Sequence, residues 1–275
     1  MSTSTTDVVP TYVPLKGNVS FAGVLGSEWV KLRSLRSTVW SLIAAVGILI
    51  GLGLLFSFAI VSRWDRLGAG EKLRFDPTAI TLRGVFLAQL AIGVLGVLII
   101  GGEFATGMIR SSLAAVPRRT PVLLGKAVVF GLVTWVLMTA SAFIVYFAGQ
   151  AVFSQKHVQS AISDPGVLRA VFGAGIYLTL IGLLGLGIAT LLRNSAAAIS
   201  TLVAIVLIVP ILVSFLPSNW VIHIDKWLPS EAGMTMLTVR HDPAQLSPLA
   251  GGLVLTGYVV VVMGFAIWDL KRRDV

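Results

Sequence analysis

The chain has 275 residues, of which 56% are hydrophobic and 12% are charged, and its formal net charge at pH 7 is +9. Soluble domains contain about 45–50% apolar and about 25% charged residues, so this composition excludes a water-soluble globular fold. The sequence has no cysteine, which excludes disulfides, thiolate metal sites and thiol nucleophiles. We therefore expect an all-α polytopic membrane protein surrounded by the lipid bilayer.

The positive charge does not indicate a nucleic-acid partner. Lys and Arg accumulate at the cytoplasmic ends of membrane spans, which accounts for a basic balance in such a protein. No basic segment of the chain is interleaved with aromatic residues, as a platform for stacking bases would require.

The N-terminal region divides into a polar part and an amphipathic part. Residues 1–20 are rich in Ser and Thr and lack the apolar core of a signal peptide, which predicts a disordered cytoplasmic tail. In the next segment, apolar residues recur at helical spacing and basic residues lie off that stripe. This pattern favours an interfacial amphipathic helix, and the alternative is that the segment simply begins the first span. The stripe consists of Phe21, Leu25, Trp29, Leu32 and Leu35, and the basic residues are Lys31, Arg33 and Arg36.

Six stretches have the length of about 20 apolar residues that a membrane helix needs. They lie at about 39–61, 84–102, 122–152, 167–192, 196–216 and 249–268, so we expect 21–275 to form one transmembrane domain. Thr120 is expected to cap the third span with Pro121 in its first position, and Pro210 to kink the fifth. Gly47 and Gly51 have the G-x-x-x-G spacing of a close-packing face, and the alternative is that this spacing arises by chance in a glycine-rich chain.

Six spans place both termini on the same side of the membrane. Compact basic clusters beside the first, third and sixth spans favour the cytoplasmic side, although the basic loop 63–83 opposes this assignment. We predict a multi-pass protein of the bacterial plasma (inner) membrane with both termini in the cytoplasm.

The sequence offers little chemistry of its own. The interiors of the predicted spans lack the ionisable residues of proton relays, and no metalloprotease or serine-hydrolase motif is present. Gly125-Lys126-Ala127 lacks the rest of a phosphate loop, so Lys126 is interpreted as a charge near the start of the third span. We expect no enzyme, no metal and no cofactor in this chain. The alternative is a membrane enzyme with residues near His223, Glu231 and His241, for which a solvated outer loop is favoured.

A polar hairpin, Gly101–Pro121, separates the second and third spans. Within it, Met108, Ile109, Leu113 and Val116 share one helical face. We predict a short cytoplasmic helix over Ala105–Val116, with Arg110 on its polar side and Glu103 pairing with Arg110 or capping the helix. Pro117 is expected to end this helix, and Arg118 and Arg119 to lie at the lipid headgroups.

Three segments resemble the permease subunits of ABC-2-type ATP-binding cassette exporters, especially the bacterial six-span stand-alone permeases. Ser27–Thr38 is similar to the elbow helix of that family, and Trp227–Gly233 to its outer loop near the exit gate. Glu103–Arg110 is similar to its E-[YF]-x-x-G-x-[IL]-[RK] turn, followed by a P-x-R-type element at Pro117-Arg118-Arg119. Met108 and Ala105 depart from the residues that are commoner in that turn.

The resemblance implies a transport function driven by another chain. Two six-span halves, from a second copy or a paralogue, would face each other above two ABC ATPase subunits that hold the ATP and Mg²⁺. A translocation path lined by small, weakly polar groups of the first, second and fifth spans would suit hydrophobic or amphipathic cargo. The alternative is a non-transport assembly or immunity factor on the same scaffold. The implied coupling residues are Glu103, Phe104, Gly107, Arg110, Pro117, Arg118 and Arg119, and those of the elbow helix are Glu28, Trp29, Lys31 and Arg33.

Overall fold

The computed structural model describes residues 20–108, 119–240 and 243–272, and in these ranges every regular element is a helix. Six of the helices are long and apolar enough to cross a membrane, which confirms the predicted number of spans. They cover Arg36–Arg66, Pro77–Thr106, Thr120–Lys156, Val167–Leu192, Ser195–Ser214 and Pro248–Arg272. The fourth span has the predicted bounds, and the others differ by a few residues at their ends.

The spans are built from long helices and short helical extensions. The main helices are α2 (Arg36–Arg63), α5 (Val85–Thr106), α7 (Arg119–Phe153), α8 (Val167–Leu192), α9 (Ser195–Val203), α10 (Val209–Ser214) and α13 (Pro248–Arg272). An additional helix, α1 (Phe21–Ser34), precedes the first span. The connections contain the short helices η1 (Trp64–Arg66), α3 (Ala69–Leu73), α4 (Pro77–Thr81), η2 (Leu82–Gly84) and η3 (Ser154–Lys156).

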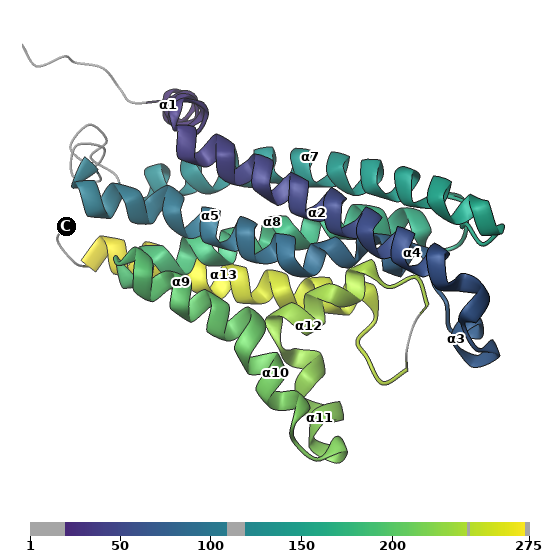
Figure 1. The fold of residues 1–275 in the computed structure, drawn as a ribbon. Coiled ribbons are helices and arrows are strands. Elements are labelled where there is room, and N and C mark those ends of the chain that lie inside the picture. The colour runs from purple at the N-terminus through teal and green to yellow at the C-terminus, as the bar shows by residue number, and fades with distance from the viewer. Residues whose placement is uncertain (1–19, 109–118, 241–242, 273–275) are drawn as a thin grey trace, which may run out of the picture.

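Glycines set the distance between the two central helices, α5 and α8, which lie side by side in the bundle (Figure 1). A Cβ atom on Gly96 would lie 2.0 Å from the carbonyl oxygen of Gly182, and one on Gly185 would lie 2.4 Å from that of Gly93. Only glycine permits this approach of two backbones. Nothing lies within 4 Å of a Cβ built on Gly47 or Gly51, so that pair is not a packing face within the described chain.

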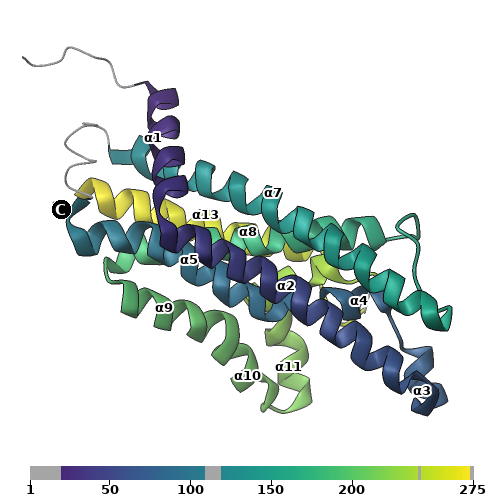
Figure 2. The same cartoon turned by 45° about the horizontal axis from the view of Figure 1, so that its top comes forward.

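Helix α1 and the C-terminal end of α13 lie at the same end of the bundle, which we name the terminal end, while α3 and α4 lie at the distal end (Figure 1). The first and last described helices thus reach the same end of the bundle, and the terminal residues lie outside the described ranges. Leu35 is extended, with φ −79° and ψ 107°, and interrupts the helix between α1 and α2. Helix α1 therefore runs across the axis of the bundle instead of continuing α2 (Figure 2).

The hairpin after the second span begins later than predicted. Helix α5 continues through Ala105 and Thr106 and ends at Gly107, whose φ of 71° is a left-handed conformation that glycine adopts without strain. The predicted start of a separate helix at Ala105 was therefore wrong, and most of the predicted helix lies outside the described residues. Arg119, Thr120 and Pro121 are already helical, so Thr120 is not the cap of α7.

The fifth span is irregular, as Pro210 predicted. A π-helical segment, η4 (Ala204–Ile208), separates α9 from α10. Proline has no amide hydrogen and its ring crowds the carbonyl four residues earlier, so the wider π turn just before Pro210 accommodates it.

The segment between the fifth and sixth spans is not the loop that the sequence predicted. It contains α11 (Ser218–Ile224), η5 (Asp225–Trp227), α12 (Pro229–Met234) and η6 (Thr235–Leu237). Helices α10 and α11 project from the bundle, and α12 returns to it beside α13 (Figure 1). Pro229, Ser230, Ala232 and Gly233 are buried. A Cβ on Gly251 of α13 would lie 2.1 Å from the carbonyl oxygen of Ala232, so α12 packs against α13 without an intervening side chain.

Candidate functional site

Four ionisable side chains meet at the terminal end, where α1, α5 and α7 converge. Lys126 Nζ lies 2.6 Å from Glu28 Oε2 and 2.9 Å from Glu103 Oε1. Lys31 Nζ lies 2.8 Å from Glu28 Oε1 and 3.1 Å from Glu103 Oε1. The two lysines and two glutamates thus form a closed ring of alternating charge, which we name the ion cluster.

Local structure places each member of the ion cluster. Glu28 and Lys31 are three residues apart on α1 and therefore share one face. Glu103 lies in the last turn of α5, and Lys126 lies in the first turns of α7. A Cβ on Gly125 would lie 2.7 Å from Val24 Cγ1, so the glycine lets α1 approach α7 closely enough for Lys126 to reach Glu28.

The ion cluster is almost removed from water. The side chains of Lys126, Glu28 and Glu103 are 3%, 4% and 7% exposed, whereas that of Lys31 is 29% exposed. Burial acts to lower the pKa of Lys31, but the hydrogen bonds and negative charges of Glu28 and Glu103 outweigh it and raise this pKa above 10.5. Buried charges are tolerated only when they are paired and hydrogen-bonded, and the closed ring meets that condition.

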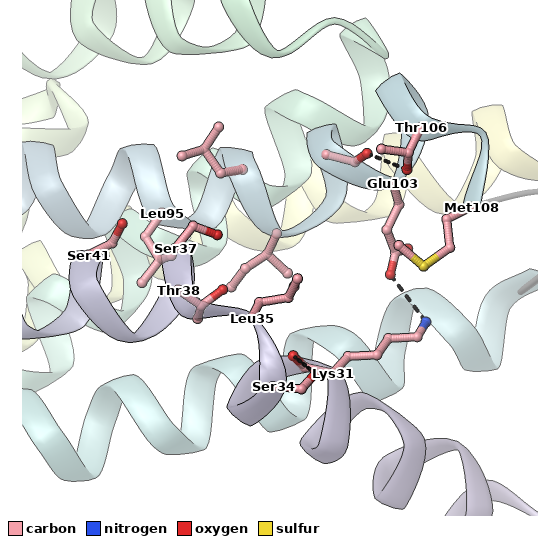
Figure 3. Close-up of a pocket in the computed structure, with 13 residues that line it drawn as sticks. Lys31, Ser34, Leu35, Ser37, Thr38, Ser41, Leu95, Glu103, Thr106 and Met108 are labelled. Carbon is pink, nitrogen blue, oxygen red and sulfur yellow. Dashed lines mark hydrogen bonds and ion pairs between the residues drawn. The ribbon is translucent and has the colours of Figure 1, made fainter.

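A cavity of about 400 Å³, which we name the elbow pocket, adjoins the ion cluster between the α1–α2 turn and the end of α5. Figure 3 shows Lys31 and Glu103 facing each other within it, with Met108 beside them. Glu103 Oε2 is buried and accepts no hydrogen bond from the described residues. The remaining polar side chains of the pocket are short hydroxyl groups from Ser34, Ser37, Thr38, Ser41 and Thr106.

A second ion pair joins the ends of α8 and α13 near the same end of the bundle. Arg193 Nη2 lies 3.1 Å from Asp269 Oδ2, and the guanidinium carbon lies 6.0 Å from the centre of the Phe104 ring. Arg193 caps α8 in a left-handed conformation, with φ 51°. The pair connects α8 and α13 to the end of α5, next to Glu103.

The structure brings three of the predicted site residues together: Glu28, Lys31 and Glu103. Glu103 pairs with two lysines, where the sequence suggested Arg110 or a helix N-terminus. Trp29 and Arg33 lie on the exposed side of α1, and Phe104 packs against the core. Gly107 ends α5. Arg110, Pro117 and Arg118 lie outside the described residues, as does the side chain of Arg119.

Sequence reasoning missed the central member of the ion cluster, Lys126. The available signal was a lysine within an apolar span, which requires a buried counter-charge. Glu231 was expected in a solvated loop, and it lies instead on α12, partly buried at a cavity.

The ion cluster is suited to joining helices, because its ion pairs link α1 to both α5 and α7 and α5 to α7. In the described residues, no group of His, Asp and Glu side chains is arranged to hold a metal ion. A comparison of the sequence with known protein families finds no matching family, and a search of curated proteins finds no similar sequence.

Proposed function

We propose that the chain is the permease subunit of an ATP-driven exporter of the ABC-2 type. In this proposal it forms the translocation path and is driven by a separate ATPase subunit. The observation that supports the proposal is the ion cluster, which ties α1 to the ends of the second and third spans. These are the ends between which the proposed ATPase-contacting hairpin lies.

The physical argument concerns the transmission of force. An ATPase that pushes on the hairpin between α5 and α7 moves the membrane helices only if the hairpin ends are firmly joined to them. Glu103 and Lys126 are hydrogen-bonded to each other directly, and both contact residues of α1. A buried charge resists separation from its partner because separation leaves an uncompensated charge, so the three helix ends move together.

The position of α1 supports an interfacial elbow helix. It lies across the bundle axis at the terminal end (Figure 2). Phe21, Trp29 and Val30 are exposed, whereas Val24 and Glu28 face the bundle. A helix that buries one face on the protein and presents Trp and Phe outward is typical of the membrane–water boundary. In the proposal this boundary is the cytoplasmic face of a bacterial inner membrane.

The proposal extends to the partners. Arg110 is the proposed contact for the ATPase, flanked by Arg118 and Arg119 as anchors at phosphate or lipid headgroups, with Pro117 and Gly107 shaping the turn. A second permease copy or a paralogue would cover apolar side chains that are exposed on α2 and α10, such as Trp40, Leu55 and Leu212. ATP and Mg²⁺ would bind only in the ATPase.

Co-purification with an ATPase tests the proposal. The full chain, extracted from its native membranes in a mild detergent, is expected to retain a subunit with a phosphate loop and to hydrolyse ATP, which the isolated chain does not. Arg110→Glu is expected to reduce the recovered ATPase at least severalfold without changing the thermal unfolding followed by Trp fluorescence. Arg74→Glu, an equal charge reversal at the exposed distal end, is the matched control. The absence of any nucleotide-hydrolysing subunit from the wild-type preparation would refute the proposal.

A further inference from the structure

A second polar cavity lies where the irregular fifth span leaves the bundle. Its volume is about 240 Å³, and we name it the acidic cavity. Helix α5 contributes Phe86 and Gln89 to its lining, and η4 and α10 contribute a mainly apolar wall that includes Pro210 and one hydroxyl group, that of Ser214. The segment η5–α12 contributes the polar side chains of Asp225, Ser230 and Glu231. The ion cluster lies at the other end of α5.

Two buried polar side chains of the acidic cavity have unused hydrogen-bonding groups. Gln89 is 1% exposed, and its Oε1 accepts a hydrogen bond from the Tyr177 hydroxyl, while its Nε2 has no partner in the described residues. Ser230 is 2% exposed, and its Oγ also has none. Buried groups of this kind are rare in native proteins and call for a missing partner. Both line the acidic cavity, so a bound molecule there is in a position to supply that partner.

The carboxyl groups of the acidic cavity have no ion-pair partner in the part of the chain that the structure describes. Among the described residues, neither Asp225 nor Glu231 forms a salt bridge. Burial raises the pKa of Glu231, and the nearby charge of Asp225 raises it further. Burial also raises the pKa of Asp225. Burial is the main cause of both shifts, and it disfavours the ionised forms of the two carboxyl groups.

The surroundings contain few other ionisable groups. Helix α8 contributes the Tyr177 phenol, and α13 contributes Tyr258, whose hydroxyl donates to the Trp227 carbonyl. Lys226 and His223 belong to the same segment as Asp225, and His223 contacts the carbonyl of Asn219. Within η4 and α10 the sequence has no ionisable residue. The acidic cavity therefore has two carboxyl groups on one side and a mainly apolar wall on the other.

We propose that the acidic cavity binds an organic cation, namely a protonated amine that carries a hydrogen-bond acceptor and an apolar body. The ammonium group would donate to Glu231 and Asp225 in charge-assisted hydrogen bonds, and Gln89 Nε2 would donate to the acceptor. Pockets for drug-sized ligands measure about 300–1,000 Å³. At about 240 Å³, the acidic cavity holds the polar head of such a molecule, while its apolar body extends along α10 into the bilayer.

This inference differs from the sequence expectation of an uncharged path, and it does not depend on an ATPase partner. The π-helical η4 contributes Val206 and Leu207 to the wall. Such segments occur frequently at functional sites because they displace side chains from regular helical positions. The π-helical wall and the two carboxyl groups that face it thus both support a ligand-binding role for the acidic cavity.

A binding assay on the purified full chain in lipid nanodiscs tests the inference. Tritiated propranolol, an amino alcohol with a naphthyl group, serves as the probe in a scintillation proximity assay, and nanodiscs without protein give the background partitioning. We expect saturable binding that is displaced by other amphiphilic amines and not by a neutral analogue lacking the amine. Loss of one charge-assisted hydrogen bond in Glu231→Gln is expected to weaken binding about tenfold or more.

Glu71→Gln is the matched control because it removes an exposed carboxylate at the distal end and changes the net charge equally. It is expected to bind as the wild type does. Gln89→Leu is expected to weaken the binding of amines that carry a hydrogen-bond acceptor more than the binding of simple alkylamines. A general loss of folding would weaken both equally. Three results would each overturn the proposal. The first is equal propranolol binding by Glu231→Gln and Glu71→Gln, the second is binding of the neutral analogue as tight as that of the amine, and the third is no binding above that of empty nanodiscs.

Discussion

Lys126→Met is the sharpest perturbation of the ion cluster because it removes one charge and keeps much of the side-chain volume. The substitution deletes the contacts of 2.6 Å to Glu28 and 2.9 Å to Glu103. It leaves two carboxylates, 4% and 7% exposed, with one lysine between them. Breaking a buried ion pair from one side costs about 3–5 kcal/mol, and we expect a destabilisation of this size for the docking of α1.

Lys31→Met is the matched control. Lys31 contacts the same two glutamates, at 2.8 and 3.1 Å, but its side chain is 29% exposed. Water reaches this side of the ion cluster and screens the remaining charges. We therefore expect Lys31→Met to destabilise the docking of α1 by an amount near the range of exposed ion pairs, about 0.2–1 kcal/mol. A third variant, Lys126→Met with Glu103→Gln, leaves the neutral pair of Glu28 and Lys31 and is expected to recover most of the lost stability.

The assay measures the position of α1 directly. The sequence contains no cysteine, so cysteines introduced at Val30 of α1 and Leu124 of α7 are the only sites for spin labels. Both side chains are exposed, at 63% and 40%. Pulsed electron paramagnetic resonance is expected to give a narrow distance distribution for the parent and for Lys31→Met, and a broad one for Lys126→Met. Equal distributions for the two lysine variants, or no recovery in the double variant, would refute the argument from burial.

Two further predictions concern packing and pH. Gly96→Ala places a methyl group 2.0 Å from a backbone carbonyl oxygen of α8. Overpacking of this kind lowers the free energy of unfolding by about 1–3 kcal/mol. Gly47→Ala is the control because its methyl group would lie in open space. Thermal unfolding followed by Trp fluorescence is expected to shift down for Gly96→Ala only, and equal shifts would contradict the proposed α5–α8 contact. Amine binding to the acidic cavity is expected to weaken as pH falls. Burial and the charge of Asp225 raise the pKa of Glu231, and protonation of Glu231 removes the negative charge that the cation needs. Titration of binding from about pH 8 to pH 5 measures this effect, and a wild-type profile as flat as that of Glu231→Gln would contradict it.

The membrane spans were predictable because a long apolar run is a local property of the sequence. The ion cluster was not, because it joins Glu28 to Lys126 across 98 residues and nothing local to Lys126 marks its partners. The same holds for α12. Its residues have the Pro, Ser and Gly content of a loop, and they are buried only because Gly233 and Gly251 allow close contact with α8 and α13.

The hairpin after the second span shows where local rules compete. The amphipathic pattern from Ala105 onward predicted a new helix, yet α5 continues to Thr106 because helix propagation adds one hydrogen bond for each residue that is fixed. It ends where Gly107 offers a left-handed conformation. The sequence therefore contained the correct boundary in Gly107, and the error came from giving priority to the periodicity of the apolar residues.

Helix α5 carries residues of both proposed sites, Gln89 at the acidic cavity and Glu103 at the ion cluster. At a rise of 1.5 Å per residue they lie about 21 Å apart along one helix. No proline interrupts α5 between them, and its contact with α8 consists partly of glycine against backbone. A continuous helix moves as a rigid body, so a displacement of Glu103 is also a displacement of Gln89. If an ATPase acts at one end and a cation binds at the other, the coupling free energy between the two events must be the same in both directions.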